Sequence, residues 1–165
     1  MDTQASVEQA VRIAEAGADL VRLTAQGVRE AENLASIRSE LRRCGITAPL
    51  VADIHFNRNA AFTAATTVEK VRINPGNFVD PGRTFRKLEY TDAEYDAELT
   101  KIEDVFGRFL DLCRENHTAV RLGVNHGSLS DRIMSRYGDT PHGMVESVME
   151  FLRVAVRRGF MDIVI

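Results

Sequence analysis

The chain has 165 residues, of which 44% are hydrophobic and 27% charged, with a formal net charge of -3. This length allows one domain with a real core, and the composition is that of a folded globular protein. A mildly acidic chain lacks the basic face of a nucleic-acid-binding protein, and no apolar run reaches the ~20 residues of a membrane span. The two cysteines, Cys44 and Cys113, form no CxxC pair, so we expect helix-end or core thiols and neither a disulfide framework nor a metal site.

Helical and strand patterns alternate along the chain. Apolar spacing, caps and terminal glycines predict helices over about 7–16, 29–43, 59–65, 91–113 and 141–158. Runs rich in β-branched residues predict strands over 19–24, 50–55, 70–74, 119–124 and 161–165. We expect the two longer connections, 75–90 and 125–139, to be loops.

Strands that alternate with helices indicate a parallel sheet with right-handed crossovers. A doubly wound sheet would normally carry a GxGxxG turn, which this sequence lacks. A TIM barrel, the (β/α)8 fold, needs eight strands, and about five are recognisable here. We therefore expect an α/β fold, an incomplete TIM barrel that fills residues 1–165 as one domain, with one strand missing before Met1 and two after Ile165.

Polar residues recur at the carboxyl ends of the predicted strands, where the active groups of a barrel cluster. They are Arg22 and Thr24, Asp53 and His55, Arg72 and Asn74, and Arg121 and Asn125. Strand side chains alternate between faces with period two, so the members of each pair point the same way. Their neighbours are apolar and must face the helices, which leaves the polar set facing the barrel lumen.

Three arginines in one lumen repel one another, and Asp53 alone cannot neutralise them. An anionic ligand would, because the planar guanidinium matches phosphate oxygens two at a time. The other interpretation is a structural ion network at the barrel mouth. The turn at 74–77 could add exposed amides that cradle an anion, and residues 125–128 offer further donors, including Ser128. His55 suits either proton donation or plain hydrogen bonding.

Five sequence blocks carry a resemblance to a known family. They are MDT at 1–3, DLVR at 19–22, VADIHF at 51–56, VRINPGN at 71–77 and RLGVNHGSL at 121–129. Together, and in order over essentially the whole chain, they resemble the IspG (GcpE) family, the 4-hydroxy-3-methylbut-2-enyl diphosphate synthases of the non-mevalonate isoprenoid pathway. The stretch 128–140 is similar to the larger bacterial and plastid form, which has an extra domain after the barrel.

The resemblance implies an iron-sulfur oxidoreductase that opens the ring of 2-C-methyl-D-erythritol 2,4-cyclodiphosphate with two electrons. It implies that Arg22, Arg72 and Arg121 hold the diphosphate, and that Asp53, His55, Asn74 and Asn125 orient it. Ser128 is included with this binding set. It further implies a [4Fe–4S] cluster, ferredoxin or flavodoxin as electron donor, a homodimer for the full-length family, and a bacterial cytoplasmic location.

The family binds its cluster through three cysteines and a glutamate of a C-terminal domain. Neither Cys44 nor Cys113 matches those positions. We therefore expect no catalytic residue, metal ligand or cofactor in this chain, and no activity from it alone. Two other readings stay open: a pterin- or phosphosugar-binding barrel related to dihydropteroate synthase, and a non-catalytic anion-binding or partner-binding barrel.

Overall fold

The computed structural model describes residues 1–55, 57–81, 84 and 89–165, through which helices and strands alternate as predicted. The strands are β1 (Val21–Ala25), β2 (Leu50–Ile54), β3 (Lys70–Ile73), β4 (Ala119–Leu122) and β5 (Ile163–Val164). The helices are α1 (Thr3–Glu15), α2 (Val28–Arg43), α3 (Arg58–Ala65), α4 (Pro75–Phe78), α5 (Asp92–Glu115), α6 (Asp131–Tyr137) and α7 (Pro141–Arg157), with a 3-10 turn, η1 (His126–Ser128).

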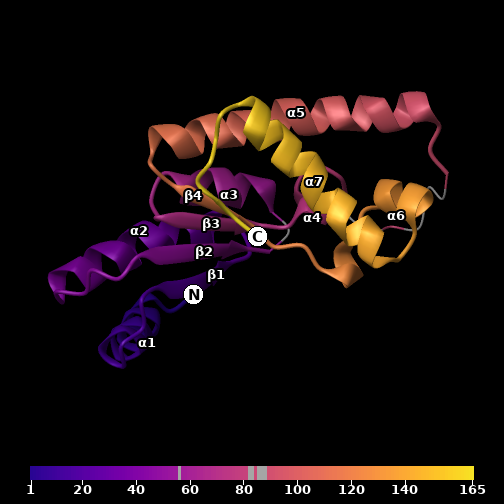
Figure 1. Cartoon of the computed structure of the whole chain (residues 1–165). Helices are drawn as coiled ribbons and strands as arrows, with labels where there is room; N and C mark the ends of the chain where they lie inside the picture. Colours follow the sequence, from indigo (N-terminus) through magenta and orange to yellow (C-terminus); the bar gives the residue numbers. More distant parts are fainter. Residues whose placement is uncertain (56, 82–83, 85–88) are drawn as a thin grey trace.

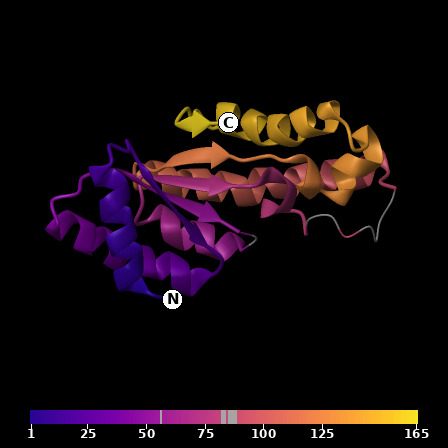
Figure 2. The same ribbon diagram turned by 90° about the horizontal axis from the view of Figure 1, so that it is seen from below.

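The strand order identifies the type of α/β fold. All five strands are parallel and lie in the order β1-β2-β3-β4-β5, so each crossover adds a strand on the same side. A doubly wound sheet would reverse direction, whereas a barrel does not. The longer helices α1, α2, α3, α5 and α7 pack each against the next around the outside of this sheet (Figures 1 and 2). The sheet is open, because β1 and β5 do not pair among the described residues. The incomplete barrel is therefore confirmed.

Local chemistry explains where the helices begin and end. Thr91 and Glu94 form a reciprocal capping box at the start of α5, as its sequence predicts. Thr140 caps α7 just before Pro141 at the first helical position. Among the described helices, none is long and apolar enough to cross a membrane.

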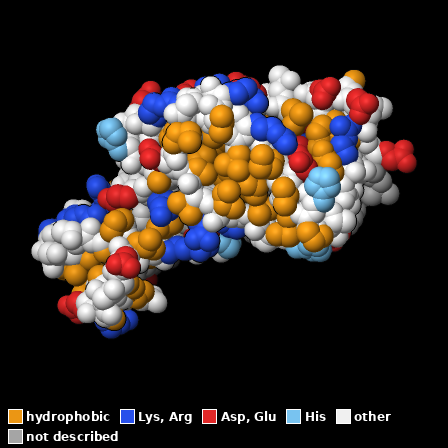
Figure 3. Space-filling model, in the orientation of Figure 1, with side chains coloured by type: hydrophobic (Ala, Val, Ile, Leu, Met, Phe, Trp, Pro, Cys, Tyr) orange, Lys and Arg blue, Asp and Glu red, His pale blue; other side chains and the backbone are white. Residues whose placement is uncertain are grey.

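The core lies between the helices and one face of the sheet. Phe78, Phe106, Phe109 and Phe151 pack there with ring centroids 4.8–6.4 Å apart. The two phenylalanines of α5, Phe106 and Phe109, therefore face the core. Hydrophobic side chains also gather on the surface around α7 and β5, with basic side chains beside them (Figure 3). The exposed large ones from 141 onward are Val145, Val156, Met161, Val164 and Ile165.

Several predicted boundaries are wrong. Helix α1 begins at Thr3 and not near residue 7, because Asp2 accepts a bond from the Ala5 amide and caps it earlier. The two expected loops contain α4, η1 and α6, which are too short to show a helical repeat in the sequence. The last strand pairs only over Ile163–Val164, and not over the whole of 161–165.

Candidate anion-binding site at the strand ends

A lateral row of polar side chains crosses the face of the sheet that the helices do not cover. Strand register places Thr24 opposite Asp53, Asp53 opposite Arg72, and Arg72 opposite Arg121. Register partners in a parallel sheet point to the same face. The alternate residues of these strands belong to the core, as the period-two pattern predicts: Val21, Ala25, Ala52, Ile54, Val71, Ile73, Val120 and Leu122.

Asp53 is the centre of this row. It is only 5% exposed, and three side chains converge on its carboxylate. Arg22 donates to Oδ2 through Nε at 3.0 Å and through a second, shorter bond from its terminal nitrogen. Arg72 donates to Oδ1 at 3.3 Å, and His55 Nε2 lies 3.3 Å from Oδ2.

These contacts keep Asp53 ionised. Burial by itself would raise the pKa of this carboxyl group, but the hydrogen bonds and positive charge of Arg22, with help from His55 and Arg72, hold the pKa below its usual value of 3.8. The carboxylate therefore stays a fixed negative charge between two guanidinium groups.

Arg72 is the most firmly placed of the three arginines, with a side chain 13% exposed. Its second terminal nitrogen donates to the Gly123 carbonyl at 2.6 Å. A Cβ on Gly123 would lie 2.0 Å from Arg72 Nε, so only glycine leaves room for this side chain. By contrast, the side chain of Arg22 is 47% exposed, and that of Arg121 lies open on the sheet face without an ion pair among the described residues.

Asn74, Asn125 and Ser128 form a second cluster beside this row. Asn74 Nδ2 lies 2.6 Å from Ser128 Oγ, which in turn lies 2.8 Å from Asn125 Oδ1. Close backbone packing supports the contact, since a Cβ on Gly76 would lie 1.7 Å from the Ser128 carbonyl oxygen. Contacts between residues far apart in the sequence thus link the connection after β3 to the connection after β4.

The expectation of exposed amides at 74–77 is wrong. Residues 75–78 form the helical turn α4, and Pro75 and Gly76 are buried. The Gly76 amide already donates to Asn74 Oδ1 at 3.0 Å, and the Asn77 amide to the Asn74 carbonyl. Both amides are used to cap α4 and are therefore not available to an anion. The role of the segment is instead to fix the position of Asn74.

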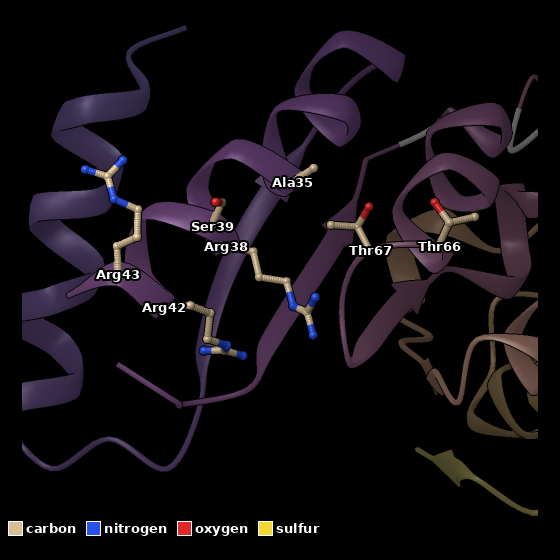
Figure 4. A pocket seen from close by; sticks show the side chains of 7 residues that line it. All are labelled: Ala35, Arg38, Ser39, Arg42, Arg43, Thr66 and Thr67. Atoms are coloured by element: carbon tan, nitrogen blue, oxygen red, sulfur yellow. The ribbon is translucent and has the colours of Figure 1, made fainter. Parts of the chain in front are cut away.

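A hollow with a volume of about 640 Å³ lies elsewhere, between α2 and the end of α3. Arg38 and Arg42 line it but share one carboxylate, Glu69, and Arg43 points away from both (Figure 4). It also adjoins the carboxyl ends of two helices, where the backbone dipole favours cations over anions. These helix ends therefore weaken the attraction of the arginines for an anion.

Sequence reasoning missed a buried group of charged residues behind the second cluster. Arg132 of α6 binds Glu150 of α7 and Asp80 after α4, and all three are at most 7% exposed. The one available signal was a charged residue, Glu150, among the mostly apolar buried positions of α7. The cysteines follow prediction, since Cys44 is exposed at the end of α2 and Cys113 is buried. Among the described residues, no His, Cys, Asp and Glu side chains gather as a metal site.

Comparisons with known proteins agree with this fold. The structure of β-methylaspartase from Clostridium tetanomorphum, in its Mg complex, matches with a TM-score of 0.50 and 16% identity over 96% of this chain and 39% of that one, which shows the fold alone. A 4-hydroxy-3-methylbut-2-en-1-yl diphosphate synthase (flavodoxin) of Bacteroides fragilis is 68% identical over 99% of this chain and 26% of its own length. The protein of the same name from Leptospira interrogans is 52% identical over 99% of this chain and 25% of its own length.

The chain thus spans about a quarter of the length of the curated relatives it matches. The family model described as the GcpE TIM-barrel domain matches residues 1–165. Because that match runs the whole length of the chain, the chain belongs to the GcpE family.

Proposed function

We propose that this chain is the substrate-binding barrel part of a non-mevalonate isoprenoid-pathway enzyme that converts 2-C-methyl-D-erythritol 2,4-cyclodiphosphate to 4-hydroxy-3-methylbut-2-enyl diphosphate. The observation that carries the proposal is the contact of Arg22 and Arg72 with the carboxylate of Asp53, with Arg121 opposite Arg72 on the same face of the sheet. Family membership favours this reading over a pterin- or phosphosugar-binding barrel and over a non-catalytic one.

Charge supports a cyclic diphosphate as ligand. Three guanidinium groups against one carboxylate leave two positive charges on this face. Each phosphorus of a cyclic diphosphate carries one ionised oxygen, so the ligand brings two negative charges. Such a ligand would neutralise the face, and each guanidinium can meet phosphate oxygens in pairs.

The contacts suggest a division of work among the side chains. Arg72, held by Asp53 and by the Gly123 carbonyl, would provide a fixed contact, whereas Arg22 and Arg121 have room to close on the ligand. Asn74, Asn125 and Ser128 would orient it by hydrogen bonds from the neighbouring cluster. His55, beside Asp53, would contribute a further polar contact.

The residues of this chain do not fit an iron–sulfur cluster. Burial raises the pKa of the Cys113 thiol to about 12, and Cys44 lies on the exposed end of a different helix. We therefore assign this chain binding and orientation only. In the proposal, the [4Fe–4S] ligands lie in a separate domain, flavodoxin or ferredoxin supplies the electrons, and the whole enzyme is a cytoplasmic homodimer.

Titration calorimetry of the chain with the cyclodiphosphate tests the binding role. We expect one site, and at least tenfold weaker binding by the Arg72→Ala variant. Arg12→Ala, which removes an exposed arginine of α1, is the matched control and should bind as the native chain does. Binding that survives Arg72→Ala unchanged would reject the proposed site.

A further inference from the structure

The buried charges behind the candidate site form one network. Arg132 donates to both carboxylate oxygens of Glu150, at 2.6 and 2.7 Å, and to Asp80 at 3.1 Å. The Tyr95 hydroxyl completes it with a short bond to Glu150, and its ring lies 4.6 Å from the Arg132 guanidinium. The network joins four parts of the chain: α5, α6, α7 and the segment after α4.

This network is a costly way to stabilise a fold. Two carboxylates surround one guanidinium, and burial raises the pKa of Asp80 despite the charge of Arg132. Replacing a buried ion network by apolar residues of similar volume is often neutral or stabilising, so such a network is weak evidence of a role in stability. Charge pairs with directional bonds do, however, define the relative position of the segments that they join.

Two of the segments that the network joins, α6 and the segment after α4, lie close in the chain to residues of the second cluster of the candidate site. Arg132 follows Ser128 closely in the chain, and Asp80 follows Asn74. Asp131, next to Arg132, accepts a bond from the Thr84 amide at 3.0 Å. The connections after β3 and β4 are therefore tied together at three points: Asn74 with Ser128, Thr84 with Asp131, and Asp80 with Arg132.

We propose that Arg132 is a positioning residue: its bonds to Asp80 and Glu150 lock the two connections together and so hold Asn74 and Ser128 where they meet the phosphate groups. With only 2% of its side chain exposed, Arg132 acts through these residues and does not itself reach a ligand. This inference rests on the proposed function for its effect on affinity, but the locking of the two connections can be measured without any ligand.

Arg132→Met tests the lock, and Arg158→Met is its matched control. Arg158 is a second arginine that binds a carboxylate, Asp111 at 2.8 Å, but its side chain is 31% exposed and it lies just after α7, away from both connections. Amide hydrogen exchange at residues 125–131 of the ligand-free chain should be at least tenfold faster in Arg132→Met than in the native chain. In Arg158→Met it should keep the native rate. Affinity for the cyclodiphosphate and for inorganic pyrophosphate should fall at least tenfold in Arg132→Met alone.

If Arg132→Met does not fold, it is replaced in these experiments by the double variant Arg132→Met/Glu150→Gln, which removes one charge of each sign from the network. Equal losses of exchange protection and affinity in Arg132→Met and Arg158→Met would show that Arg132 only stabilises the fold. Native exchange rates over 125–131 in Arg132→Met would reject the proposed locking of the two connections. If the native chain binds neither ligand, the proposed function fails, while the exchange comparison still decides the inference.

Discussion

Replacing Gly123 by alanine perturbs Arg72 without removing any of its charge. The added Cβ would lie 2.0 Å from Arg72 Nε and 2.7 Å from Cζ, well inside van der Waals contact. The flexible guanidinium should give way rather than the backbone. It would then lose its 2.6 Å bond to the Gly123 carbonyl and its 3.3 Å bond to Asp53.

A hydrogen bond to a charged group contributes about 1.5–3 kcal/mol. If the displaced Arg72 loses one such bond to phosphate, binding should weaken about 10- to 100-fold, since ~1.4 kcal/mol corresponds to a factor of ten. Titration calorimetry with the cyclodiphosphate measures this directly. Gly127→Ala is the control, because its Cβ would meet only Asn125 Oδ1, at 3.9 Å. Equal affinities of the two alanine variants would refute the role given to Arg72.

Three further changes test the structure more widely. Gly76→Ala should lower the free energy of unfolding by about 1–3 kcal/mol in urea titrations, because its Cβ meets backbone 1.7 Å away; a native midpoint would contradict this packing. Because the pKa of Asp53 is lowered, its stabilising effect is complete above pH about 4 and is lost as the pH falls through that pKa, so Asp53→Asn should show a shallower acid-induced loss of stability than the native chain. A thiol reagent should modify Cys44 quickly and Cys113 only after unfolding, and two fast thiols in the native chain would count against the buried position of Cys113.

The sheet and its polar face could be predicted because both follow from simple periodicity. Arg22, Asp53, Arg72 and Arg121 fall at alternate positions of strands whose other residues are apolar, so one rule places them all on the same side. The barrel type of strand order was likewise accessible, since helices alternate with strands and no doubly wound motif occurs. Whether the five strands close or stay open depends on the pairing of the outer strands, which only the structure shows.

The parts that escaped prediction depend on contacts between distant segments. Helix α6 has no apolar stripe to reveal it, because Asp131 and Arg132 are buried in polar contacts. Periodicity also cannot show that Asp53 would gather two arginines and a histidine, or that Gly123 leaves space for Arg72. Such pairings depend on side-chain directions and backbone separations that exist only in the folded chain.

The order of the strands also bears on how the protein could be assembled during synthesis. Every strand of the described sheet lies beside the strand made just before it, so each new β-α unit can dock on a surface that already exists. The candidate binding face would grow in the same order. Arg22 would meet Asp53 when β2 docks, Arg72 would join them with β3, and the Gly123 carbonyl that holds Arg72 would arrive with the segment after β4.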